Sequence, residues 1–183
     1  MLKYISLLLS LSLTYPAQAQ IASHCAPHES AIIDAWMGNT VITDSGYKNT
    51  QQGKLVSLCA DQKKEPFTRL SYRYGRPGQI EMTVDATPST PFIIANLSTG
   101  PRTGMDVIAF SRGEFSYYLA INGGQASGVH LQVFKGKKSI VDHFSGNHDG
   151  DDYQLGEAEI DFSGKQARSP VLKMGKLKHN LAP

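Results

Sequence analysis

The sequence predicts an all-β protein, mainly antiparallel, built as a small sandwich or barrel. Apolar and polar residues alternate with a period of two in several stretches after residue 54. Turn signals rich in glycine and proline separate these stretches about every ten residues. No long amphipathic helix intervenes, so the pattern favours consecutive antiparallel strands over the strand–helix–strand alternation of a parallel sheet.

Residues 1–19 have the layout of a cleaved signal peptide. Lys3 provides a positive start, residues 5–13 form an apolar run broken only by serines, and Ala17-Gln18-Ala19 has the form of a cleavage site. The run is shorter than the ~20 residues of a spanning helix, so we expect export without a membrane anchor. Residues 20–183 would remain as a single β-rich domain.

The charge is nearly balanced, with 18 lysine and arginine against 16 aspartate and glutamate residues. Nucleic-acid binders show a strong basic excess or stripe, so we expect no nucleic-acid partner. No stretch after the signal peptide is long and apolar enough to span a membrane, so we also expect a protein that does not cross one.

The two cysteines, Cys25 and Cys59, predict one disulfide because an even pair in an exported chain is typical of such a bond. The loop between them would stabilise the fold by roughly 3–4 kcal/mol. Their spacing lacks the C-x-x-C form of a zinc site. A free or catalytic thiol is the alternative reading.

The first segments of the domain are ambiguous. Residues 29–37 (ESAIIDAWM) suit one face of a short N-terminal helix, and they also suit a strand that continues into residues 41–43. Residues 45–53 are polar and rich in turn formers, which predicts a loop.

Later segments read as strands. Residues 68–74 and 79–84 form the clearest hairpin, with Gly75-Arg76-Pro77-Gly78 as the reversal. Pro88 and Pro91 exclude residues 85–91 from a central strand. Further strands are expected at 92–96, 105–110, 114–121, 129–134 and 139–144. The chain beyond residue 164 is basic and broken by proline, so we expect a solvated, flexible tail from about residue 165.

The acidic segment 147–152 (NHDGDD) is the strongest candidate for a metal site, because calcium binds six to eight oxygens on a bendable loop. The candidate ligands are Asn147, Asp149, Asp151 and Asp152. The spacing departs from the EF-hand, since Asp152 and Ala158 stand where glycine and glutamate are required. A solvated acidic turn between two strands, with no cofactor bound, is the reading we favour.

A candidate partner-binding surface contains Arg69, Arg73, Arg76 and Tyr118. Arginine and tyrosine are enriched at interface hot spots. Strand alternation puts the arginines on the face opposite Tyr72 and Tyr74, so we expect the arginines at the surface. An ordinary strand with a charged outer face is the alternative.

Three stretches carry a resemblance: residues 53–59 (GKLVSLC), 72–75 (YRYG) and 110–117 (FSRGEFSY). Over most of residues 25–144 the chain resembles a group of uncharacterised small exported proteins of the Gram-negative cell envelope. The resemblance implies a small disulfide-bearing β-domain and brings no active site. The architecture is also similar to that of periplasmic lysozyme inhibitors, although no inhibitory loop carries over.

The sequence contains no G-x-S-x-G elbow, H-E-x-x-H pair or phosphate loop. We therefore expect a non-enzymatic periplasmic or secreted protein that binds or inhibits an envelope protein, such as a hydrolase or, in an immunity-like role, a toxin. One alternative is a metal-dependent hydrolase that uses the acidic turn with His143 or His148. The other is an envelope component that binds glycan or lipid through Tyr118 or Trp36. The partner and the oligomeric state stay open.

Overall fold

The computed structural model describes residues 21–100 and 103–181, so the predicted signal peptide lies outside the described residues. The described residues form strands, one short 3-10 turn (η1, Gly124–Ala126) and no α-helix. The strands make two large sheets and one separate hairpin, which confirms the all-β, mainly antiparallel prediction. No helix in this part of the chain has the length and apolar character needed to span a membrane.

The first sheet has the strand order β12-β1-β4-β5-β6, and all its neighbouring strands are antiparallel. Its strands are β1 (Ser30–Met37), β4 (Lys54–Ala60), β5 (Leu70–Arg76), β6 (Gln79–Ala86) and β12 (Tyr153–Leu155). Of the two readings of residues 29–37, the strand is confirmed and the possible short helix is wrong, because residues 30–37 form β1. Ile33, Ala35 and Met37 alternate along this strand and are almost fully buried, which is the strand period.

The second sheet has the strand order β11-β10-β9-β8-β7-β13. Its strands are β7 (Phe92–Gly100), β8 (Thr103–Arg112), β9 (Phe115–Asn122), β10 (Gly128–Lys135), β11 (Lys138–Phe144) and β13 (Leu172–Met174). Consecutive strands from β7 to β11 pair antiparallel, while β13 pairs with β7 in parallel. Residues 87–91 carry the chain from β6 in the first sheet to β7 in the second.

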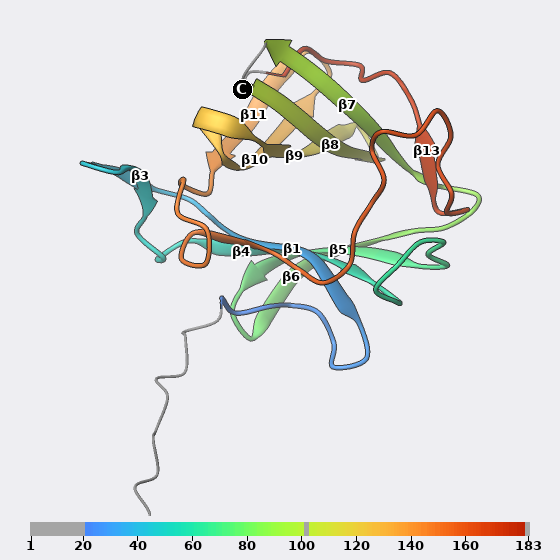
Figure 1. Ribbon diagram of the computed structural model, residues 1–183, viewed down its shortest axis with the longest axis horizontal. Helices are drawn as coiled ribbons and strands as arrows, with labels where there is room; N and C mark the ends of the chain where they lie inside the picture. The colour runs from blue at the N-terminus through green and yellow to red at the C-terminus, as the bar shows by residue number, and fades with distance from the viewer. Residues whose placement is uncertain (1–20, 101–102, 182–183) are drawn as a thin grey trace, which may run out of the picture.

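The hydrophobic core lies between the two sheets, which face each other as the layers of a sandwich (Figure 1). A group of aromatic rings forms part of this core. The ring centroid of Phe110 lies 4.9 Å from the centroid of each of three other rings, those of Tyr72, Phe92 and Tyr117. Because Tyr72 belongs to β5 and the others to the second sheet, these rings connect the two layers. Such pairs contribute about 0.5–1.5 kcal/mol each beyond their buried area.

The segment after residue 165 differs from the solvated tail that we expected. Val171 is fully buried in the core, and Leu172 begins β13. Leu177 and Leu181 pack on the outer face of the second sheet. His179 holds this end in place, since its Nδ1 lies 2.7 Å from the hydroxyl of Tyr118 and its Nε2 lies 2.7 Å from the carbonyl oxygen of residue 136. Lys173, Lys176 and Lys178 are exposed, whereas Leu177 and Leu181 contact the sheet.

Candidate functional site

A small hairpin of β2 (Thr40–Thr43) and β3 (Gly46–Asn49) stands apart from both large sheets. Figure 1 shows it projecting from one side of the sandwich. Ile42 lies opposite Tyr47 across the two strands. Gly46 has a φ of 119°, a conformation open mainly to glycine, and it follows the two turn residues at positions 44 and 45.

The hairpin exposes apolar side chains to solvent. Ile42 is 80% exposed, Val41 50% and Tyr47 49%. The other large hydrophobic side chains that are exposed in the described residues lie singly on β6, β11 and β12. Single exposed hydrophobic residues are normal on a protein surface, whereas several on one projecting element are typical of an interaction site.

The acidic turn at 147–152 attaches the hairpin to the sandwich. The amide of Tyr47 donates to Asn147 Oδ1 at 2.8 Å, and the amide of Asn147 donates to the carbonyl oxygen of Tyr47 at 2.7 Å. Lys48 Nζ donates to Asp151 Oδ2 at 3.1 Å. A two-stranded hairpin alone is marginally stable in water, so these contacts explain how an exposed one keeps its shape.

Asp152 is the buried centre of this attachment, with a fully buried side chain. Its Oδ1 accepts a hydrogen bond from the amide of Asn49 at 2.9 Å. Its Oδ2 accepts one from the amide of His148 at 3.1 Å and lies 3.0 Å from the Nδ1 of the same residue. The carbonyl oxygen of Asp152 accepts from the amide of Trp36 in β1 at 2.9 Å. One residue therefore joins the hairpin, the turn and the first sheet.

The structure does not bring the four predicted metal ligands together. Asn147 and Asp152 bind the backbone of β3, Asp151 pairs with Lys48, and Asp149 is exposed. Within residues 21–100 and 103–181 no group of three or more histidine, cysteine, aspartate or glutamate residues could hold a metal. The predicted calcium ligands instead supply acceptors and one ion pair to the hairpin.

Two arginines of the predicted partner-binding surface, Arg69 and Arg73, instead hold the N-terminal segment through Glu29. The Glu29 side chain is 2% exposed, and Arg73 Nη2 donates to its Oε1 at 2.8 Å. Arg69 Nη2 reaches the same oxygen at 3.3 Å. The hydrogen bond from Arg73 is the main reason why the pKa of Glu29 falls from its usual 4.5 to about 2. Of the three arginines, Arg76 is the one that lies exposed at the end of β5 without an ion pair among the described residues.

Tyr118 does not share a surface with these arginines. It lies on β9 in the other sheet and is 2% exposed, because the C-terminal segment covers it. Trp36, the other aromatic side chain considered for glycan binding, is half-buried in β1. The sequence alone could not reveal that the C-terminal segment covers Tyr118.

The predicted disulfide is present between Cys25 and Cys59, with the two Cα atoms 5.4 Å apart. It attaches the N-terminal segment to the outer face of the first sheet. Beside it, the Ser57 hydroxyl donates to Asp34, and the amide of His24 donates to Ser57 Oγ at 3.0 Å. Burial raises the pKa of Asp34.

Serine, histidine and aspartate meet in this cluster, yet the cluster is closed to substrate. The side chain of Ser57 is fully buried, and its hydroxyl is already engaged by Asp34 and by the His24 amide. A nucleophile must reach the substrate and be activated by a base. The arrangement therefore serves packing of the N-terminal segment, and the site that faces solvent is the hairpin.

Comparisons of the chain with protein-family models, with curated proteins and with solved structures found no significant match. The candidate site therefore depends on the geometry of this chain. Sequence reasoning missed the hairpin because it joined residues 41–43 to the preceding segment and assigned 45–53 to a loop. The available signal was two short runs of strand-forming residues on either side of Asp44-Ser45.

Proposed function

We propose that the protein is a non-enzymatic periplasmic binding or inhibitory protein, and that the β2–β3 hairpin enters a concave surface of an envelope protein such as a hydrolase or a toxin. The observation that carries this proposal is the 80% exposure of Ile42 on a projecting hairpin that buried contacts hold in place. The disulfide and the signal-like N-terminal segment support an oxidising compartment outside the cytoplasm.

The attachment of the hairpin to the sandwich favours binding of the proposed partner. Association costs free energy when flexible groups become ordered, and an element that already has its bound shape avoids part of this cost. The contacts of Asn147 and Asp152 with β3 supply that order before any partner arrives. The apolar side chains of Ile42 and Val41 can then act as anchors that a partner desolvates.

The size of the hairpin argues for a concave partner. A stable interface buries about 800 Å² on each side, which is more than one short hairpin offers to a flat surface. A projecting element that enters a cleft is surrounded on several sides and buries a larger share of its area. Clefts of this kind are the substrate-binding sites of hydrolases, so occupation of a cleft would inhibit the enzyme.

The test compares two matched substitutions, Ile42→Asp on the hairpin and Ile80→Asp on β6. Ile80 is 46% exposed and lies in the strand at the far edge of the first sheet. We expect wild type and I80D to retain the same partner from periplasmic extract, and I42D to bind it at least about tenfold more weakly because a charge replaces an apolar anchor.

Inhibition of the partner is tested separately, by measuring its enzymatic activity. If the retained partner is a hydrolase, wild type and I80D should lower its activity and I42D should not. Equal retention of the partner by I42D and wild type would contradict the assignment of the hairpin as the binding element.

A further inference from the structure

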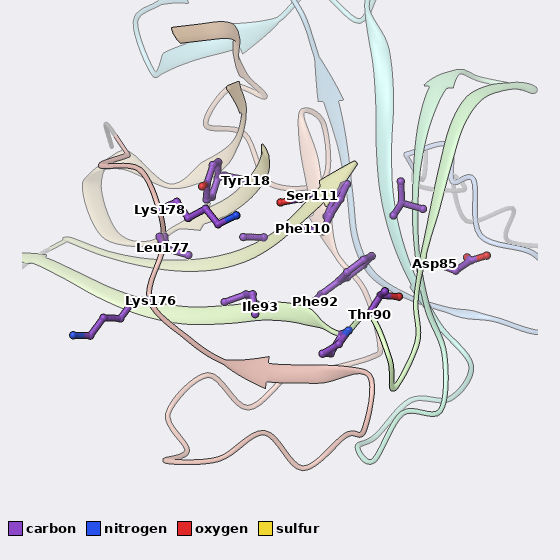
Figure 2. A pocket seen from close by; sticks show the side chains of 13 residues that line it. Asp85, Thr90, Phe92, Ile93, Phe110, Ser111, Tyr118, Lys176, Leu177 and Lys178 are labelled. Atoms are coloured by element: carbon purple, nitrogen blue, oxygen red, sulfur yellow. The ribbon is translucent and has the colours of Figure 1, made fainter. Parts of the chain in front are cut away.

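A cavity of about 500 Å³ is lined by Phe92 and Ile93, the residues of β7 that pair with β13. Figure 1 shows β13 on the side of the molecule opposite the β2–β3 hairpin. The cavity is bounded by β6, the crossover into β7, the end of β8 and the C-terminal segment (Figure 2). A volume of this size falls within the range of small-molecule sites, which is roughly 300–1,000 Å³. Neither the hairpin nor the acidic turn contributes a residue to it.

The walls of the cavity are mainly apolar and are fixed by the fold. Phe92 and Phe110 stack with their ring centroids 4.9 Å apart, and both belong to the aromatic group of the core. Ile93 and Ala109 lie opposite each other where β7 pairs with β8. Leu177 contributes from the C-terminal segment. The two phenylalanines are themselves buried and give the cavity a rigid base, while Ile93 and Leu177 are half-buried and leave apolar surface open to a ligand.

The charged side chains around the cavity differ in whether they point toward it. Figure 2 shows the side chain of Lys178 extending across the cavity, whereas those of Lys176 and Asp85 point away from it. Asp85 is also engaged elsewhere, since Ser71 Oγ donates to its Oδ1 at 2.6 Å. Lys178 forms no ion pair with any residue in the described ranges. The cavity thus offers one cation beside apolar walls, with the hydroxyl-bearing residues Thr90 and Ser111 at its border.

We infer that this cavity binds a small amphipathic anion, a carboxylate or sulfonate joined to an apolar body. Lys178 pairs with the anionic group, and the half-buried side chains of Ile93 and Leu177 contact the apolar body. A cationic ligand would meet Lys178 unfavourably, and a neutral one would leave the lysine without a partner. A charge-assisted hydrogen bond to an ammonium group adds more affinity than a neutral one. The inference is independent of the proposed role of the hairpin.

The probe for the test is 8-anilinonaphthalene-1-sulfonate, an aromatic anion whose fluorescence rises in apolar surroundings. The neutral N-phenyl-1-naphthylamine serves as its uncharged counterpart. The two variants are Lys178→Gln and the matched control Lys176→Gln, which changes a lysine that points away from the cavity. Near-ultraviolet circular dichroism on each variant verifies that the probe reports a folded protein.

We expect wild type and K176Q to bind the anionic probe with the same affinity, and K178Q to bind it about tenfold more weakly. The neutral probe should bind all three proteins equally. Displacement by decanoate or by 1-naphthoate then distinguishes an aliphatic from an aromatic body. Equal affinity of wild type and K178Q for the anionic probe, or the absence of saturable binding to wild type, would overturn the inference.

Discussion

Glu29 shows how one buried carboxylate fixes a whole segment. Its oxygens accept from Arg73, from Arg69 and from the amide of Ala26 at 2.7 Å. Arg73 also donates to the carbonyl oxygen of His24 at 3.0 Å. Together with the disulfide at Cys25, these bonds hold residues 21–29 over the outer face of the first sheet. Arg69 and Arg73, which the sequence predicted to bind a partner, therefore form contacts within the molecule.

Replacement of this carboxylate should reduce stability in a pH-dependent way. Arg73 lowers the pKa of Glu29 from 4.5 to about 2, so its stabilising effect is complete above pH 4.5 and is lost as the pH falls toward 2. We expect Glu29→Gln to lower the free energy of unfolding at pH 7 by about 2–3 kcal/mol, and the difference from wild type to shrink between pH 4.5 and 2. Urea unfolding at a series of pH values measures both effects.

The control for this change is Glu157→Gln. Glu157 pairs with Lys63 through side chains that are 70% and 65% exposed, so solvent screens this pair. Its loss should change stability little at any pH. Equal losses of stability in the two variants would show that the Glu29 cluster acts only as a surface ion pair.

The sequence predicts the roles of some residues but not of others. The Cys25–Cys59 bond was predictable, since two cysteines allow one pairing and the signal-like N-terminal segment predicts an oxidising compartment. The outward direction of Arg69 and Arg73 followed from strand alternation. Their partner Glu29 lies about forty positions earlier and meets them only because β1, β4 and β5 are neighbours. No local pattern contains that information.

At the scale of elements, the hairpin and the acidic turn behave as one unit. The turn supplies acceptors to the backbone of β3 through Asn147 and Asp152, and residues 148 and 151 reach the side chains of Ser45 and Lys48. The acidic composition that resembled a metal site is thus explained by the need for acceptors close to unpaired amides. Sequence alone does not distinguish a metal site from a set of acceptors for backbone amides, because both uses place several carboxylates in one short turn.

Removal of the buried carboxylate should release the hairpin while the sandwich stays folded. We expect Asp152→Ala to accelerate amide hydrogen exchange in β2 and β3 by about tenfold or more, because the hairpin loses the buried acceptor of the Asn49 amide. The amides of β4 should keep their protection. Asp149→Ala is the control, since Asp149 is exposed and its side chain makes no hydrogen bond with the described residues. Unchanged exchange in the hairpin of the Asp152 variant would contradict the attachment described above.

The strands themselves were predictable to different degrees. The hairpin of β5 and β6 was clear, because Leu70 and Tyr72 alternate with polar residues and both are buried. β1 was ambiguous, since its bulge at residues 31–33 interrupts the alternation. β13 gave no usable signal, because three residues are too few for periodicity and its partner β7 lies far away in the chain.

At the scale of the whole molecule, two faces differ in the kind of ligand that they suit. The hairpin offers exposed apolar side chains on a braced projection, which suits a protein partner. The cavity near the C-terminal segment offers mainly apolar walls and one lysine, which suits a small anion. The sandwich between them supplies rigid support for both, since its core connects the two sheets through the aromatic group around Phe110.

The most direct measurement of the role of the hairpin is photo-cross-linking in living cells. A photoreactive phenylalanine analogue is placed at position 42 on β2 or, as control, at position 80 on β6, and both positions are exposed. We expect illumination to give one predominant adduct with an envelope protein from position 42 and none from position 80. No adduct from position 42, or the same adduct from both positions, would show that the hairpin does not bind the partner.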